Sequence, residues 1–72
     1  MKLSSVEEGR RVRVMSVAGG DAVKRRLGAL GFVAGALVRV VRISYGNMIL
    51  AVHESRIAVD EATAGEIEVE AA

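Results

Sequence analysis

The chain has 72 residues, 51% of them hydrophobic and 26% charged, with one histidine, no cysteine, no proline and a formal net charge of +1. This is the composition of one small folded domain covering residues 1–72, and it excludes a disulfide-rich scaffold, a thiolate metal site and a disordered tail. A chain this short has little room for a deep catalytic cleft, so its hydrophobic core must supply its stability.

Two apolar segments could be mistaken for membrane signals. Glu7 and Glu8 interrupt the N-terminal stretch before the apolar part of a secretory signal develops. The uncharged run from Leu27 to Val38 contains three glycines, and a membrane-spanning helix needs about 20 apolar residues. We therefore expect a cytoplasmic protein that does not insert directly into a membrane.

Alternating apolar residues predict a first strand from Arg11 to Val17. The alternation changes phase at Met15, which is typical of a strand with a β-bulge. Upstream of this strand, Leu3 and Val6 are isolated apolar residues, and we expect them to close one end of the fold.

One helix is predicted from Asp21 to the region of Gly31. Asp21 is the expected N-cap residue, and Gly31 is the expected left-handed residue that ends the helix. Val23, Leu27 and Leu30 recur at helical spacing and form the apolar stripe that faces the core. A helix this short is marginal alone, so we expect it to pack on a sheet.

The outer face of this helix carries Lys24, Arg25, Gly28 and Ala29. A glycine in a helix interior costs about 1 kcal/mol relative to alanine, so Gly28 requires an explanation. It could relieve crowding against a neighbouring strand, or it could allow a partner's backbone to approach closely. The second interpretation makes these four residues the candidate partner-binding site.

Two further strands follow the helix. Gly35 suits a type II turn that leads into a strand from Leu37 to Ile43, whose alternation also changes phase midway. Tyr45-Gly46-Asn47 is a hairpin signal. The nearly continuous apolar run from Met48 to Val52 then predicts a central strand that is covered on both faces.

The C-terminal third predicts the remaining elements. A short fourth strand from Arg56 to Val59 leads to Asp60, which caps a single helical turn that ends at Gly65. The segment from Glu66 to Glu70 alternates strictly, as a half-buried edge strand does, and its charges discourage edge-to-edge pairing.

Five short strands with one short α-helix between the first two predict a mainly β fold, a small SH3-like five-stranded antiparallel barrel. Its expected core contains Val14, Leu27, Leu30, Phe32, Val40, Leu50, Ile57, Ile67 and Val69.

Charge is unevenly distributed along the chain. Residues 10 to 42 hold eight Lys or Arg and one acid, whereas residues 54 to 70 hold six acids and one arginine. Because a barrel interleaves its two halves, we expect cross-strand ion pairs to cancel much of this difference, the alternative being a basic surface.

No residue pattern predicts an enzyme. The chain has no cysteine, a single histidine and no serine in a nucleophile turn, and its carboxylates lie on turns and on an edge strand. His53 and Glu54 form the only local metal-ligand pair, with Asp60 and Glu61 the other carboxylates nearby in sequence. A stable transition-metal site requires three or four ligands, so we expect no resident metal or cofactor.

Nucleic acid is the serious alternative to a protein partner, because small basic barrels can follow phosphates. The aromatic residues needed for base stacking are limited to Phe32 and Tyr45, and we expect Phe32 in the core. Gly19-Gly20 could form an anion site at a helix N-terminus, but Asp21 occupies that position with a negative charge. The basic residues available for phosphate contacts are Arg10, Arg11, Arg13, Lys24, Arg25, Arg39 and Arg42.

The sequence resembles the FeoA family of bacterial ferrous iron transport accessory proteins, a domain also found at the C-terminus of metal-dependent repressors. The resemblance lies in Arg26-Leu27, Leu30-Gly31-Phe32 and Gly35, which have the spacing of the family's glycine and leucine signature, and in the valine-rich strand through Val40. Family members commonly carry proline where Ala34 and Asn47 stand, so these two turns are less rigid here. The pattern continues through Gly46, Ala58-Val59, Ala64, Ile67 and Val69.

The resemblance implies an SH3-like domain that docks from the cytosol on a FeoB-like membrane iron transporter and regulates it, as a monomer or weak oligomer. Two other functions stay open at this point. One is a regulatory domain of a transition-metal-linked repressor system, and the other is a small-barrel RNA-binding protein.

Overall fold

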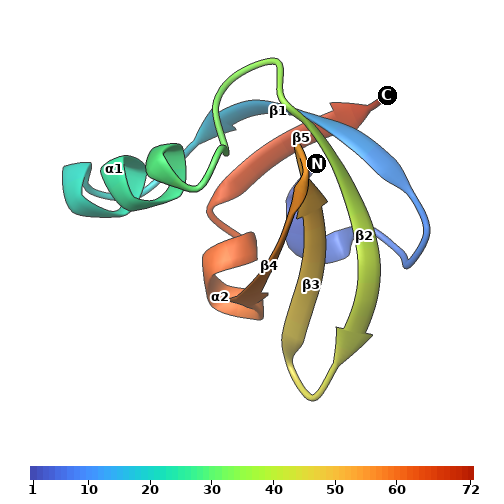
Figure 1. Cartoon of the computed structure of the whole chain (residues 1–72). Helices are drawn as coiled ribbons and strands as arrows, with labels where there is room; N and C mark the ends of the chain where they lie inside the picture. Colours follow the sequence, from blue (N-terminus) through green and yellow to red (C-terminus); the bar gives the residue numbers. More distant parts are fainter.

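The computed structural model describes all 72 residues and contains a single five-stranded antiparallel sheet in the order β4-β3-β2-β1-β5 (Figure 1). The strands are β1 (Arg11–Val17), β2 (Leu37–Ser44), β3 (Asn47–Val52), β4 (Ser55–Asp60) and β5 (Ile67–Ala71). The helices are the 3₁₀ turn η1 (Leu3–Ser5), α1 (Asp21–Ala29) and the single turn α2 (Glu61–Ala64). The predicted fold class and the single helix between the first two strands are therefore confirmed.

The sheet bends around one hydrophobic core of 16 buried residues, none of which is polar or charged. Leu3 and Val6 belong to it, so the N-terminal segment closes one end as predicted. Of the expected core residues, Leu30 is 41% exposed, which contradicts the prediction, and Ile57 is half-buried against the cluster. The other expected residues are buried: Val14, Leu27, Phe32, Val40, Leu50, Ile67 and Val69.

Two irregularities in strand pairing produce the bend. The register of β1 against β5 shifts between Val14 and Ser16, and that of β2 against β3 shifts between Val40 and Arg42. Both positions coincide with the phase changes in the sequence, because an extra residue reverses which side chains face the core. Met15, the extra residue in β1, is 48% exposed.

The apolar run in β3 is not covered on both faces, contrary to the sequence prediction. Met48, Leu50 and Val52 are buried, whereas Ile49 and Ala51 are only half-buried. Only η1 and α2 lie close against the sheet, and α1 stands away from it (Figure 1), so no helix covers the side of β3 that carries Ile49 and Ala51. A strand with a continuous hydrophobic run can leave one side in solvent when a residue on that side is as small as alanine, because little apolar surface is then exposed.

The start of α1 differs from the prediction by one residue, and its end agrees. Gly20 is the N-cap, and Asp21 is the first helical residue and makes no capping hydrogen bond. There its carboxylate still lies in the first turn, where negative charge is favourable. Gly31 has a φ of +105°, the left-handed conformation expected of the residue that ends the helix.

The helix α1 stands away from the sheet, attached through loops at both ends (Figure 1). Leu27 is its only buried residue, and Val23 packs partly against the core. Leu30 follows the last helical residue, so the apolar stripe has two members inside the helix instead of three. No helix in the structure is long and apolar enough to span a membrane.

The turns form as the sequence predicts. Tyr45 and Gly46 both have positive φ and connect β2 to β3 as a two-residue hairpin loop. The backbone amide of Ala36 donates to the carbonyl of Val33 at 3.0 Å and closes the turn at Gly35, whose φ is +90°. The Asp60 carboxylate accepts from the Thr63 amide at 2.7 Å and caps α2.

Candidate partner-binding surfaces

The four predicted partner-binding residues lie together on the side of α1 that faces away from Leu27. Lys24, Arg25 and Ala29 are exposed, and Gly28 is half-buried. At 100° per residue these positions occupy one contiguous arc of the helix, opposite the buried stripe. We call this set the α1 outer face.

The space around Gly28 distinguishes the two explanations for this glycine. A Cβ added at Gly28 would meet no atom within 4 Å, so nothing in the chain is crowded there. Gly31 is different, because an added Cβ would lie 3.0 Å from side-chain atoms of both Val52 and His53. Crowding against a neighbouring strand is therefore excluded as the reason for Gly28, and close approach by another molecule stays available.

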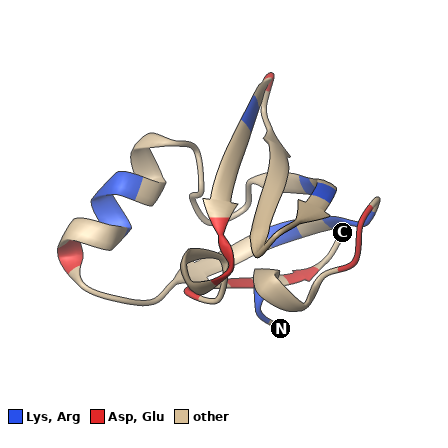
Figure 2. Ribbon diagram, turned by 90° about the horizontal axis from the view of Figure 1, so that it is seen from below, with Lys and Arg blue, Asp and Glu red and all other residues tan.

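Charge is segregated on the surface of the molecule. Figure 2 shows Lys and Arg on α1, β1 and β2, and Asp and Glu along β5, around α2 and at the turns. Only two ion pairs form: the N-terminal amine with Glu68 at 3.0 Å, and Arg13 with Glu70 at 3.9 Å. The expectation that cross-strand pairs would cancel much of this charge difference is wrong, because only two acids lie on β5, beside β1, and most of the others lie in turns and short helices.

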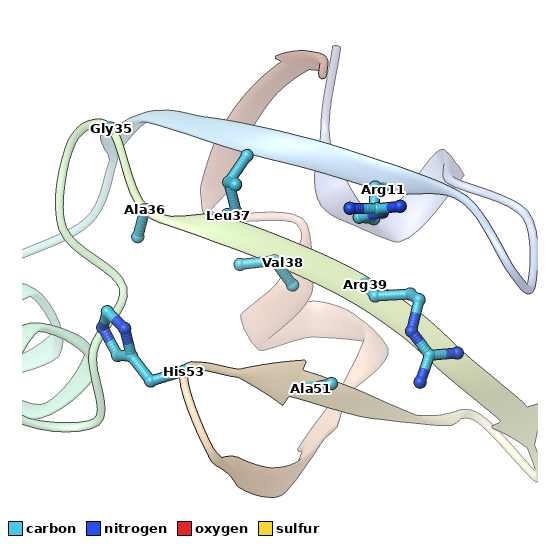
Figure 3. Close-up of a pocket in the computed structure, with 8 residues that line it drawn as sticks. All are labelled: Arg11, Gly35, Ala36, Leu37, Val38, Arg39, Ala51 and His53. Carbon is cyan, nitrogen blue, oxygen red and sulfur yellow. The ribbon is translucent and has the colours of Figure 1, made fainter.

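A groove of about 490 Å³ opens on the convex side of the sheet. Its lining residues come from β1, from β2 and the loop before it, and from β3 and the turn after it (Figure 3). The charged or titratable members are Arg11, Arg39 and His53, and no acid lines the groove. Both arginines are among the residues predicted as possible phosphate contacts, but the groove itself is not predictable from the sequence, because Arg11 and Arg39 come together only through the register of β1 and β2.

A second, smaller cleft of about 260 Å³ separates α1 from β4 and α2. Leu30 lines it, which explains how a leucine of the signature can be 41% exposed. Arg26 and Asp60 lie on its opposite walls. Hydrogen bonds from Thr63, through its hydroxyl and its backbone amide, hold the pKa of Asp60 below its usual value, with a smaller contribution from the positive charge of Arg26.

The predicted metal-ligand candidates are not brought together. His53 and Glu54 form the exposed turn between β3 and β4, whereas Asp60 and Glu61 lie at the other end of β4. No group of three or more His, Asp or Glu side chains is arranged to hold a metal ion. The turn offers at most two ligands, fewer than a stable transition-metal site needs.

The bent five-stranded antiparallel sheet and its short helices define the class of this protein as a small SH3-like domain. The chain belongs to the FeoA domain family, whose model matches residues 1–71. This family is linked to ferrous iron transport.

Solved FeoA proteins share both the fold and a substantial part of the sequence. The FeoA protein of Chlorobium tepidum is 34% identical, with a TM-score of 0.91 over 99% of this chain and 70% of that one. The Stenotrophomonas maltophilia FeoA complexed with zinc, described as an SH3 domain protein, is 32% identical, with a TM-score of 0.86 over 97% of this chain and 89% of that one.

A more distant likeness shows the fold alone. The IdeR of T. acidophilum is 15% identical, with a TM-score of 0.89 over 100% of this chain and 34% of that one. No curated protein matches the chain.

Proposed function

We propose that this protein is a cytoplasmic accessory factor of bacterial ferrous iron uptake, which docks on the cytosolic side of a FeoB-like transporter and regulates it without chemistry of its own. Membership of the FeoA family supports the link to iron transport. The proposed contact is the α1 outer face, consisting of Lys24, Arg25, Gly28 and Ala29. Residues 1–72 act as one domain in this proposal, as a monomer or weak oligomer.

The observation that carries the proposal is the unoccupied space around Gly28. This glycine weakens a helix that is already short, and no neighbouring atom in the chain requires position 28 to lack a side chain. It makes the middle of the α1 outer face flat, so a partner's backbone can approach it. Lys24 and Arg25 add positive charge at the rim, where charge mainly increases the rate of association.

Two variants of the α1 outer face test this proposal. Gly28→Leu fills the flat patch, and Arg25→Glu reverses a rim charge; Lys2→Glu makes the same charge change outside this face and serves as the control. Each variant is first checked for native melting behaviour. Binding to the purified cytosolic region of a FeoB-type transporter and rescue of ferrous iron uptake in cells lacking the protein are then measured.

We expect Gly28→Leu and Arg25→Glu to weaken binding and uptake while Lys2→Glu retains both. Binding of the parent should also weaken as salt rises, because part of the attraction is between exposed charges. If both α1 variants bind the transporter and rescue uptake as well as the parent protein does, this face is not the interface.

The repressor-domain alternative rests on the fold of relatives such as IdeR, which are too different in sequence to carry function. The two functions make different predictions. A repressor-type domain would act on transcription of iron-uptake genes, whereas the docking proposal predicts changes in uptake at constant transporter level.

A further inference from the structure

The convex side of the sheet carries a row of arginines that no acid in the chain neutralises. Strand register places Arg11 of β1 directly opposite Arg39 of β2, Arg39 opposite Ala51 of β3, and Ala51 opposite Arg56 of β4. All three arginines are exposed, and none forms an ion pair. We call these four residues the arginine row.

Three acids near the sheet are engaged by other partners, and no acid of the chain forms an ion pair with the row. Glu70 pairs with Arg13, and Glu68 pairs with the N-terminal amine. Glu8 accepts a hydrogen bond from the backbone amide of Ile43 at 2.7 Å. The arginine row is therefore left free to bind an external anion.

The row is also unfavourable for the fold of the isolated chain. Like charges directly opposite each other on neighbouring strands destabilise a sheet, and Arg11 and Arg39 form such a pair. When a residue lowers the stability of the fold and no contact within the chain explains it, a role in binding another molecule is a common reason. Three of the four residues of the row, Arg11, Arg39 and Ala51, also line the groove, and the exposed Leu37 lines it beside them.

We propose that the arginine row and its groove bind an extended acidic segment of a partner protein. Guanidinium groups bind carboxylates through paired, charge-assisted hydrogen bonds. The row crosses three strand spacings, about 14 Å in all, and an extended peptide places every second side chain on one side, so that residues i and i+4 lie about 13 Å apart. Five residues of an extended segment with acids at every second position thus span the length of the row, and Leu37, which is 47% exposed, offers an apolar contact beside it.

Acidic peptide suits this surface better than nucleic acid. No Phe, Tyr or Trp lines the groove, so the small imidazole of His53 is the one aromatic ring there on which a base could stack. Phe32 is buried, and Tyr45, although fully exposed, lies at the hairpin that ends β2. The proposal does not depend on docking through α1, since none of the arginine row lies on that helix.

The test is a titration of the isotope-labelled full-length protein with three probes of equal length. The first is a peptide of alternating glutamate and serine, the second the same peptide with lysine in place of glutamate, and the third a single-stranded oligouridylate. We expect saturable binding of the glutamate peptide that weakens with salt and shifts the amide signals of Arg39, Ala51 and Arg56. The lysine peptide should not bind.

Variants then test the residues. Arg11→Gln combined with Arg39→Gln should weaken binding of the glutamate peptide about tenfold or more, because two charge-assisted contacts are lost. Its melting temperature should equal or exceed that of the parent, since the opposed pair is removed. Lys2→Glu is the control for net charge and should bind like the parent.

Three results would overturn the proposal. They are no saturable binding of the glutamate peptide, binding that the double variant leaves unchanged, and binding of the oligouridylate at this surface in preference to the peptide. The amide signal shifts in the parent protein show where the peptide binds, so they test the binding site even if the double variant does not fold.

Discussion

Two glycines only three residues apart show how differently the same residue type can be used. Gly28 lies within the helix in open space, so its cost is the conformational entropy that any glycine loses on folding. Gly31 adopts a φ of +105°, with Val52 and His53 against the position that a Cβ would occupy. The first glycine is not required by the fold, and the second is.

Alanine substitutions at the two glycines should therefore have opposite effects. Gly28→Ala should stabilise the protein by about 0.5–1 kcal/mol. Gly31→Ala should destabilise it by about 1–2 kcal/mol from backbone strain, with the two close contacts adding to this cost. Chemical denaturation of both variants beside the parent measures the difference, and a stabilising Gly31→Ala would contradict the assigned conformation.

The capping residue Asp60 predicts a pH dependence of stability. Its pKa is lower in the folded protein than its ordinary value of 3.8, chiefly through hydrogen bonds from Thr63. A lowered pKa contributes stability that is fully present above the unfolded value and is lost as pH falls through the folded value. Asp60→Ala should thus melt at a lower temperature than the parent at neutral pH.

The difference in melting temperature between Asp60→Ala and the parent should shrink as pH falls below 3.8. Melting curves followed by circular dichroism across acid pH measure it. Thr63→Val provides the matched control, because it removes the hydroxyl but keeps the backbone donor, and it should show a smaller pH dependence. A constant difference at all pH values would contradict the cap.

At the scale of the element, α1 is held mainly by one side chain. Leu27 is fully buried, whereas Leu30, just beyond the last helical residue, is 41% exposed at the smaller cleft. Both leucines belong to the same signature. Because the helix ends before Leu30, only Leu27 of the two points from the helix into the core. Leu27 fixes α1 to the core, and Leu30 leaves an apolar edge beside it.

The same substitution at the two leucines should have unequal costs. Leu27→Ala should destabilise the protein by about 2–5 kcal/mol, since it removes buried contacts and leaves a cavity. Leu30→Ala should cost less than about 1 kcal/mol, because the side chain is already partly in solvent. Urea titrations compare the two directly, and equal costs would show that Leu30 is packed more tightly than its exposure indicates.

At the scale of the whole molecule, the charges are segregated and the metal-ligand residues are dispersed. Acids lie along β5, around α2 and at the turns, whereas Lys and Arg lie mainly on α1 and on the strands (Figure 2). His53 and Glu54 stand alone at one turn. The surface thus presents separate positive and negative regions and no cluster of three or more metal-ligand side chains.

Titration of the isolated protein with ferrous, manganous and zinc ions under anaerobic conditions should show no binding tighter than about 1 μM, because two exposed ligands do not complete a coordination shell. His53→Ala should change any weak zinc binding by a small factor only. Tight binding that disappears in His53→Ala would overturn this prediction, and sedimentation in the presence of the metal would show whether two copies supply the ligands together.

The sequence determined most of what depends on neighbouring residues. Alternation marked three of the strands and both bulges, and a continuous apolar run marked β3. The glycines and asparagine at the turns marked the points where the chain reverses, because these signals arise from local backbone sterics. The resemblance to the FeoA family could also be recognised from the spacing of glycines and leucines in the stretch around α1. The four residues of the α1 outer face were named from helical periodicity alone.

Only the tertiary structure decided which residues meet across strands and how α1 sits against the core. The exposure of Leu30 depends on where the helix ends and on the cleft beside it. The arginine row depends on the register of four strands, and the unpaired state of its charges depends on β5 lying at the edge beyond β1. These are contacts between residues far apart in the chain, and no local preference specifies them, because register is set by how the whole core packs.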